Sequence, residues 1–205
     1  MIKTDDSVDL SKAVNILRRG GVILSPTDTV WGLMCDFENA KAVGRIFKIK
    51  KSKPRPIAVL CDNFERIEQL EICFTTIGRR IAEYFWPGPI TIVLKSNSRR
   101  IGYVSGENNT IGIRVPDCFD LKELIRDFGK PLAATSANYA GQNPPRLLSE
   151  IPTEVVSKTD FIYEFNIKPS GVNSTVIDCV SDNFKLIRQG AVTREDIQKV
   201  LGIYE

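Results

Sequence analysis

The sequence predicts a single-domain α/β fold, with one twisted, open, mixed sheet and helices that flank it. Short apolar runs rich in β-branched residues alternate along the chain with segments of helical periodicity. Polar turns that contain glycine or proline separate these segments. The 205 residues are 42% hydrophobic and 26% charged, which is typical of one globular domain, and we expect its core at about residues 7–202.

The first predicted elements are a helix over residues 11–19 and a strand over residues 22–24. Apolar residues recur at helical spacing in the first segment. Ser7 or Asp9 is the expected cap of this helix, and Gly20-Gly21 is the expected stop. The short strand that follows ends at a polar turn, residues 25–29, in the place where an open α/β sheet puts its ligand loops.

The remaining elements are predicted from the same patterns. A second helix is expected over residues 38–50, because its apolar residues share one face and the prolines at 54 and 56 stop it. Apolar runs predict six more strands, at residues 57–60, 90–94, 111–115, 132–134, 174–177 and 185–187. Helical patterns predict helices at residues 75–85, 119–128 and 193–201. The segment 139–152 is rich in glycine, asparagine and proline and is expected to form a long ordered loop.

The composition excludes several kinds of chemistry. The chain contains no histidine, which excludes Ser-His-Asp and Cys-His catalysis, histidine acid–base chemistry and histidine metal ligation. Its five cysteines are widely spaced, without a Cys-x-x-Cys pair, and are expected to be buried free thiols. No carboxylate cage for a metal is evident, so no residue is assigned to a metal. Any catalysis must therefore depend on charge, positioning and hydroxyl groups.

Charge and hydropathy bear on location and partners. The N-terminus lacks the pattern of a signal or transit peptide, and no apolar run approaches the ~20 residues of a membrane span. We therefore expect a cytoplasmic protein without membrane contacts. The net charge of +3 is too small to indicate nucleic-acid binding by itself. Six basic residues lie close together without an acidic residue among them: Arg45, Lys48, Lys50, Lys51, Lys53 and Arg55. A solvated helix face explains this run as well as a phosphate-facing loop does.

Polar residues interrupt or end several of the apolar strands. They are Thr27-Asp28-Thr29 after the first strand, Arg114, Thr135-Ser136-Ala137-Asn138 and Arg188. Arginines in such places hold phosphate or carboxylate groups, while hydroxyl and amide groups orient a nucleotide or an amino acid. Taken singly, the serine, threonine, aspartate and asparagine positions are more typical of turns and caps, and Asp28 either caps its turn or supports a ligand-binding residue. These residues predict an anion-binding cleft without a Walker or dinucleotide motif.

Six motifs in a fixed order make the prediction more specific. They are PTDTVWGL at 26–33, WPGPIT at 86–91, IRVP at 113–116, TSAN at 135–138, NSTVID at 173–178 and RQG at 188–190. Together they resemble the motifs of the YrdC-like family of L-threonylcarbamoyladenylate synthases, whose first signature reads PTDTVYGL. The resemblance runs from about residue 10 to the C-terminus. It is closest to the short form of the family, so residues 1–205 are expected to be one YrdC-like domain without an additional C-terminal domain.

The resemblance implies a fold, an activity and a set of partners. The fold would be the YrdC-like twisted mixed sheet with a basic concave cavity. The activity would be a nucleotidyltransferase reaction in which L-threonine, bicarbonate and ATP give threonylcarbamoyl-AMP and pyrophosphate, for threonylcarbamoyladenosine modification of tRNA position 37. ATP and Mg²⁺ are then expected at the site, and a threonylcarbamoyl-transfer complex is expected downstream. Such chemistry depends on alignment and charge neutralisation and needs no histidine.

The resemblance also assigns residues, position by position. Those matching the threonine contacts are Thr29, Arg114, Ala134 and Ser174. Those matching the ATP contacts are Lys53, Arg55, Thr110, Ser136, Asn138, Pro144 and Arg188. Those expected to act in catalysis are Lys50, Lys51, Lys53, Ser136 and Asn138.

The basic loop departs from the family pattern, which is Lys-x-Arg-Pro followed by a Lys-Pro or Asn-Pro step. Residues 50–56 read KKSKPRP, so the expected arginine is displaced or missing. Alignment from the preceding helix matches Lys50 and puts Ser52 at the arginine position, whereas alignment on Pro54 matches Lys51 and puts Lys53 there. Lysine makes weaker bidentate phosphate contacts than arginine does.

This departure leaves two alternatives to the synthase. One is a catalytically altered paralogue that binds tRNA or double-stranded RNA through the basic cavity. The other is an enzyme of the same fold with another carbamoyl or acyl-phosphate substrate. RNA binding would weaken steeply with added salt, whereas a small-molecule site would require threonine and ATP together.

Overall fold

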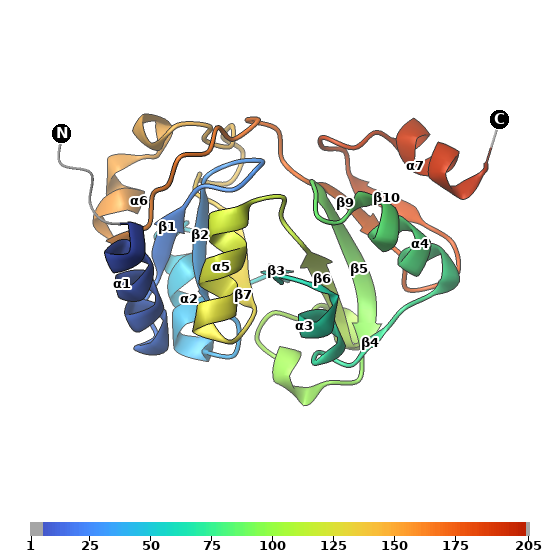
Figure 1. The fold of residues 1–205 in the computed structure, drawn as a ribbon, viewed down its shortest axis with the longest axis horizontal. Coiled ribbons are helices and arrows are strands. Elements are labelled where there is room, and N and C mark those ends of the chain that lie inside the picture. The colour runs from blue at the N-terminus through green and yellow to red at the C-terminus, as the bar shows by residue number, and fades with distance from the viewer. Residues whose placement is uncertain (1–5, 204–205) are drawn as a thin grey trace.

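The structure of this chain, a computed structural model, describes residues 6–203 and is built on one mixed sheet (Figure 1). From one edge to the other, its strands are β10 (Lys185–Arg188), β9 (Thr175–Asp178), β5 (Ile90–Ser96), β6 (Thr110–Arg114), β3 (Ala58–Leu60), β7 (Leu132–Ser136), β2 (Gly32–Asp36), β1 (Ile23–Ser25) and β8 (Phe161–Ile162), while β4 (Ile72–Cys73) pairs with β5. β5 runs parallel to β9, β3 to β6 and β1 to β8, and the other neighbours are antiparallel. The predicted single-domain α/β fold with a mixed sheet is therefore confirmed.

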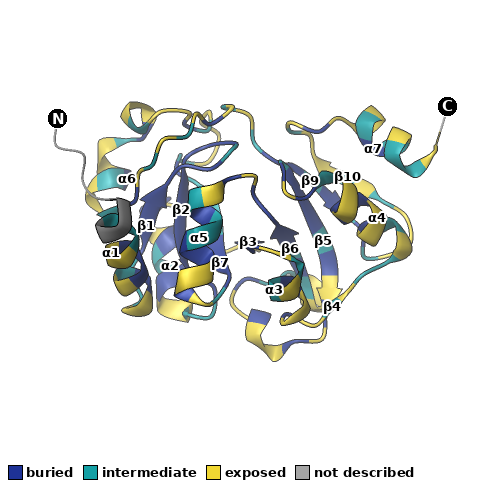
Figure 2. Ribbon diagram, viewed as in Figure 1, coloured by how far each residue is buried: buried dark blue, intermediate teal, exposed yellow. Residues whose placement is uncertain are grey.

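Helices cover the two faces of this sheet. Within residues 6–203 they are α1 (Asp6–Arg18), α2 (Ala40–Ile49), α3 (Phe64–Glu68), α4 (Thr76–Phe85), α5 (Phe119–Phe128), α6 (Thr153–Ser157) and α7 (Arg194–Leu201). α1 and α5 pack beside each other over one face, where they form the smaller apolar cluster. α2 and α4 pack on the other face, which carries the larger cluster. In Figure 2 the strands are accordingly mostly buried, and the outer sides of the helices are exposed.

The position of the cavity follows from how side chains alternate along the strands. In β6, Ile111 and Ile113 are buried in the larger cluster, whereas Thr110, Gly112 and Arg114 face the other way. The small cluster under α1 and α5 draws its strand residues from β1, β2, β7 and the end of β3. Side chains of β5, β6 and β9 on this same face instead line a cavity.

Most predicted elements are present within one or two residues of their expected bounds. The predicted helix at 11–19 begins earlier, however: the chain is already helical at Asp6, so Ser7 and Asp9 lie inside α1 and the predicted cap is wrong. Polar and acidic residues are tolerated in the first turn of a helix, which is why they resemble a cap in the sequence. Gly20 ends this segment in the left-handed conformation, with φ +78°, as predicted.

The strand β2 was not predicted. It is buried along its whole length between β1 and β7, so it shows no alternation of polar and apolar residues. Because β1 and β2 form an antiparallel hairpin, the polar turn after the first strand is the hairpin loop, residues 26–31. The short elements α3, α6, β4 and β8 were also not predicted, since segments of two to five residues carry too little pattern.

Two smaller predictions concern the thiols and the loop at 139–152. All five cysteines are free, and four are buried as predicted, but Cys73 is exposed. It lies on β4, which pairs only with β5 among the described strands, so its side chain reaches solvent at the sheet edge. The loop is irregular apart from a short turn at Leu148–Glu150.

No helix in residues 6–203 has the length and apolar composition needed to cross a membrane.

Candidate functional site

A cavity of ≈ 590 Å³ lies beside α1 and α5, on the face of the sheet that these two helices cover in part. Its walls come from β2, β3, β5, β6, β7, β9 and β10, with the loop after α2 at its mouth. Eight of the predicted site residues line it: Thr29, Arg55, Thr110, Arg114, Ala134, Ser136, Ser174 and Arg188. Five predicted residues do not line it: Lys50, Lys51, Lys53, Asn138 and Pro144. Five of the eight lie on strands and share one surface because they occupy the same face of the sheet, whereas Thr29, Arg55 and Ser174 reach it from loops.

Arg114 occupies the deep end of the cavity and is only 5% exposed. Its guanidinium donates hydrogen bonds to Gly88 O at 3.0 Å, to Thr29 Oγ1 at 2.8 Å and to Asp28 Oδ1 at 2.5 Å. Burial lowers the pKa of Arg114, and the Asp28 carboxylate opposes that shift. Since a guanidinium has five N–H groups, two remain without a partner among the described residues. Asp28 therefore supports a cavity arginine, one of the two roles that the sequence left open.

The loop between β1 and β2 holds the Thr29 hydroxyl in place. Thr27 Oγ1 lies 2.8 Å from both Thr29 Oγ1 and Val30 O, and it accepts the backbone N–H groups of Thr29 and Val30 at 3.0 Å. Thr27 and Thr29 are both buried. The polar turn is thus a closed hydrogen-bond network that presents Thr29 to Arg114.

Arg188 reaches the cavity because of a bulge in β10. Lys185 pairs with Asp178 and Leu186 with Ile177, but Arg188 pairs with Val176, so Ile187 is an extra residue in the ladder. In a regular ladder Arg188 would oppose Thr175 and point toward the core. The bulge instead places it opposite Val176, on the face that lines the cavity.

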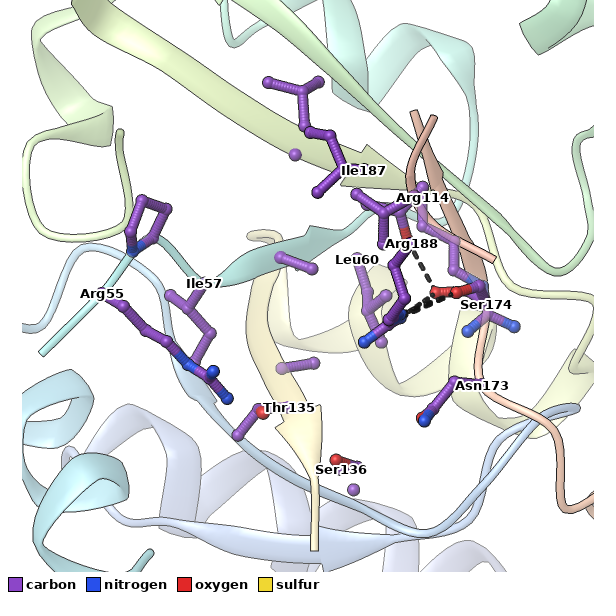
Figure 3. Close-up of a pocket in the computed structure, with 18 of the residues that line it drawn as sticks. Arg55, Ile57, Leu60, Arg114, Thr135, Ser136, Asn173, Ser174, Ile187 and Arg188 are labelled. Carbon is purple, nitrogen blue, oxygen red and sulfur yellow. Dashed lines mark hydrogen bonds between the residues drawn. The ribbon is translucent and has the colours of Figure 1, made fainter. Parts of the chain in front are cut away.

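Arg188 is anchored on Ser174, as Figure 3 shows. Its Nε and Nη2 atoms donate to Ser174 O at 3.3 and 2.7 Å, and Nη2 also donates to Ser174 Oγ at 3.2 Å. Burial lowers the pKa of Arg188, and the positive charges of Arg114 and Arg55 lower it further. Three guanidinium groups are therefore close enough to repel one another across the cavity.

The three arginines come from different walls of the cavity. Figure 3 shows Arg55 extending from the opposite wall to Arg114 and Arg188. Two carboxylates, Glu107 and Asp178, also line the walls. A phosphate or carboxylate group between the arginines would relieve their repulsion and accept charge-assisted hydrogen bonds.

The basic residues of the loop after α2 have different environments. Lys50 is only 3% exposed and donates to the backbone oxygens of Ser136 and Asn138. Burial lowers the pKa of Lys50 to about 8, and the charge of Arg55 contributes. Lys51 is exposed and pairs with Glu154 at 2.6 Å. Lys53 is also exposed, and Arg55 is the residue of this loop whose side chain lines the cavity.

The other two predicted residues outside the lining are Asn138, just after β7, and Pro144, in the loop at 139–152. The Asn138 amide donates to Tyr139 O at 3.1 Å and to Gln142 O at 2.6 Å, while its Oδ1 is buried without a partner among the described residues. Pro144 precedes Pro145, whose carbonyl accepts the Trp31 N–H at 2.9 Å. The loop is thereby fastened to the hairpin loop that carries Thr29.

Some lining residues were not predicted. Thr91, Asn173 and Ile187 line the cavity. Thr91 and Asn173 both lie within motifs that the sequence analysis singled out, and Thr91 interrupts an apolar run at a position facing away from the core. That position was a signal for Thr91, whereas nothing in the local pattern indicates the bulge at Ile187.

The described residues contain no group of three or more histidine, cysteine, aspartate or glutamate side chains able to hold a metal ion by themselves. Glu107 and Asp178 supply carboxylate oxygens in the cavity, the donor type that Mg²⁺ prefers. These residues fit a Mg²⁺ ion that is also held by substrate phosphates, as is usual for this ion.

Comparison with known proteins gives a consistent set of relatives. The family model Sua5_yciO_yrdC, described as telomere recombination, matches residues 15–190. The chain is 30% identical to a threonylcarbamoyl-AMP synthase of Bacillus subtilis over 98% of this chain and 58% of the relative. It is 28% identical to a threonylcarbamoyl-AMP synthase of Vibrio vulnificus over 89% of this chain and 98% of the relative. The chain thus spans little more than half the length of some curated relatives, and nearly all of others.

Solved structures agree with this set. A crystal structure of Pyrococcus abyssi Sua5 complexed with L-threonine superposes with a TM-score of 0.88 at 30% identity, over 98% of this chain and 59% of that one. The crystal structure of Escherichia coli YciO has a TM-score of 0.80 at 25% identity and covers 92% of both chains.

Proposed function

Because this chain belongs to the Sua5/YciO/YrdC family, we propose that it is an L-threonylcarbamoyladenylate synthase, a nucleotidyltransferase that makes threonylcarbamoyl-AMP and pyrophosphate from L-threonine, bicarbonate and ATP. The observation that carries the proposal is one cavity with three arginines and a buried hydroxyl-rich end. Its ≈ 590 Å³ lies within the usual range of small-molecule sites, roughly 300–1,000 Å³.

The deep end suits the amino acid. Thr29, Arg114 and Ser174 are each less than 9% exposed and supply hydroxyl and guanidinium groups around a small volume. The two unpaired N–H groups of Arg114 match a carboxylate of L-threonine. A relative with 30% identity has been crystallised with L-threonine, which supports the same assignment.

The mouth of the cavity suits the nucleotide. Arg55 and Arg188 stand on opposite sides of the mouth and carry the charge that a triphosphate requires (Figure 3). We assign the phosphate contact of the basic loop to Arg55, since Lys50 is occupied by backbone oxygens and Lys51 by Glu154. The guanidinium of Arg55 is the planar, bidentate donor group whose presence the altered sequence of the basic loop had placed in doubt.

The chemistry then requires positioning more than acid–base catalysis. The threonine amine forms an N–C bond with bicarbonate and releases water, which gives a carbamate. A carbamate oxygen attacks the α-phosphorus of ATP, and the bond to the pyrophosphate oxygen breaks. Arg55, Arg114 and Arg188 would hold the reacting anions together against their own repulsion and neutralise charge on the phosphoryl oxygens. Mg²⁺ bound with the ATP phosphates would add charge neutralisation at the leaving group.

The product implies partners beyond the substrates. A carbamoyl adenylate is an activated acyl donor, so we propose that a threonylcarbamoyl-transfer complex consumes it in tRNA modification. The alternative of direct tRNA or double-stranded RNA binding has less support from the basic run. Arg45 pairs with Asp160, Lys51 pairs with Glu154, and Lys50 is buried, so this run presents few unpaired charges to a phosphate backbone.

The proposal is tested by pyrophosphate release from ATP with Mg²⁺ and bicarbonate, measured with and without L-threonine. We expect threonine-dependent release that falls by at least about tenfold in Arg188→Ala, because one charge-assisted contact to the phosphates is lost. Arg99→Ala, at an exposed arginine outside the cavity, is the matched control and should behave as the unaltered protein does. Absence of threonine-dependent release in folded protein would overturn the proposal, and salt-sensitive RNA binding in a gel-shift assay would then support the paralogue alternative.

A further inference from the structure

The hydroxyl of Thr91 contacts Ser174, the cavity serine that also holds Arg188. Thr91 lies on β5, is 4% exposed and has its Oγ1 atom 2.9 Å from Ser174 Oγ. Its neighbours Ile90 and Ile92 are fully buried in the core, so a threonine here places a hydroxyl on the cavity face of an otherwise apolar strand segment. A buried hydroxyl in such a position requires a hydrogen-bond partner.

Either hydroxyl of this pair can donate to the other, and the two arrangements leave different protons free. Each hydroxyl has one proton and two acceptor sites. Ser174 Oγ already accepts from Arg188 Nη2 at 3.2 Å. Among the described residues, Thr91 Oγ1 has Ser174 Oγ as its partner and no other. If Ser174 donates to Thr91, the Thr91 proton is the one left without a partner among the described residues; if Thr91 donates, it is the Ser174 proton, and both residues line the cavity. In the arrangement in which Thr91 donates, Ser174 accepts twice, from Thr91 and from Arg188.

That second arrangement leaves the Ser174 proton without a partner in the cavity wall. Ser174 lines the cavity, so its remaining capacity is a single donor available to a bound ligand. A donor in this place matches an anionic or carbonyl oxygen. Packing holds the arrangement in place: a Cβ built at Gly112 would lie only 3.3 Å from Thr91 Cγ2, so the methyl group fills the space beside that glycine.

We propose that Thr91 is a positioning residue that directs the Ser174 hydroxyl, as a donor, toward an oxygen of the bound amino acid. The inference rests on the proposed function, because it names a contact of that same site. Thr91 itself is expected to touch no substrate. Its effect should appear in amino-acid affinity and not in nucleotide affinity, since Arg188 keeps its contacts to the Ser174 backbone oxygen.

The test compares Thr91→Val, which replaces the hydroxyl by a methyl group of similar size, with Thr91→Ser, which keeps the hydroxyl. Binding of L-threonine is measured by calorimetry without turnover, and KM for each substrate is measured by pyrophosphate release. We expect Thr91→Val to weaken L-threonine binding roughly tenfold with an unchanged KM for ATP, and Thr91→Ser to restore most of the affinity. Should Thr91→Val fail to fold, Thr91→Ser and Thr91→Ala differ by the same hydroxyl and provide the comparison.

A double-mutant cycle separates this role from a general packing defect. In a Ser174→Ala background, Thr91→Val should have little further effect, because the hydroxyl that Thr91 positions is gone. Equal L-threonine affinity of Thr91→Val and the unaltered protein, or a tenfold loss that persists in the Ser174→Ala background, would overturn the inference while leaving the synthase proposal intact. Failure of the unaltered protein to bind L-threonine would overturn both.

Discussion

Two buried cationic residues, Arg114 and Lys50, have different surroundings. Arg114 is paired with Asp28 and hydrogen-bonded to Thr29 and Gly88, so its charge is compensated. Lys50 is equally buried but donates only to the neutral carbonyls of the segment after β7, and no carboxylate in residues 6–203 pairs with it. The Lys50 amine therefore links the Ser136–Asn138 segment to the end of α2. Because its charge is buried without a carboxylate partner, that charge lowers the stability of the fold.

The pKa of Lys50 gives a pH dependence with a definite sign. Its pKa is 10.5 in the ordinary state and about 8 when folded. Between these values the unfolded chain binds the proton and the folded chain does not, so the free energy of unfolding rises with pH across this window. The contribution is at most about 3 kcal/mol. Urea unfolding at pH 7 to 10.5 should show this rise relative to Lys50→Met.

Lys41 provides the control for this experiment. It is exposed on the same helix, so Lys41→Met should leave the pH profile unchanged. If the unaltered protein and Lys50→Met show parallel profiles, the amine of Lys50 is not shielded from water, and the proposed fastening role is wrong.

At the scale of elements, the ends of β9 and β10 decide where Arg188 lies. The bulge at Ile187 turns Arg188 to the cavity face, and Gly190 then allows the chain to pass close to β9. A Cβ at Gly190 would lie 2.3 Å from Asn173 O and 2.5 Å from Ser174 C. The turn therefore requires glycine for close backbone approach, next to the serine that contacts both Arg188 and Thr91.

Gly190→Ala should consequently disrupt this junction. We expect a loss of about 2 kcal/mol or more in the free energy of unfolding, because the clash is with backbone atoms that cannot move aside cheaply. Thermal unfolding and pyrophosphate release are the measurements, and both should fall. Gly44→Ala is the matched control: a Cβ there meets nothing within 4 Å and lies within α2, so it should stabilise the protein by about 0.5–1 kcal/mol. Equal stability of the two variants would contradict this account of the turn.

For the whole molecule, the cavity is a place where folding brings like charges together, since Arg114 and Arg55 both lower the pKa of Arg188. Its walls come from seven strands of one sheet, and they bring together Arg55, Arg114 and Arg188. The termini of the described chain lie at opposite ends of the molecule, away from the middle of the sheet (Figure 1). An anion that binds between these arginines would stabilise the native state, since the unfolded chain does not hold the arginines together.

Inorganic pyrophosphate provides a simple test of this coupling. At about 100 times its Kd, a ligand that binds only the native state adds about 2.7 kcal/mol, which corresponds to a rise of roughly 5–10 °C in Tm for a chain of this size. Differential scanning fluorimetry should detect the rise. It should be smaller in Arg188→Ala, unchanged in Arg99→Ala, and weaker at high salt. An equal rise in all three proteins would indicate nonspecific ion effects instead of an anion site.

Most of the longer helices and strands were readable from the sequence, because they depend on local periodicity and on stop signals such as Gly129 and Pro131. Arg114 was readable as a candidate site residue because it interrupts the apolar run at 111–115. The motifs identified the family, and the resemblance named eight residues that do line the cavity. These features are carried by neighbouring residues, so one sequence suffices to predict them.

Tertiary structure alone decided the contacts between distant segments. The hydrogen bond of Arg114 to Asp28 spans 86 residues and that of Thr91 to Ser174 spans 83. The burial of β2 on both faces, the bulge that turns Arg188 and the choice of Arg55 over Lys50 at the cavity all depend on strand register. Register is determined by which strands pair and how their side chains pack, and a shift of one residue exchanges the two faces of a strand, so no local pattern specifies it.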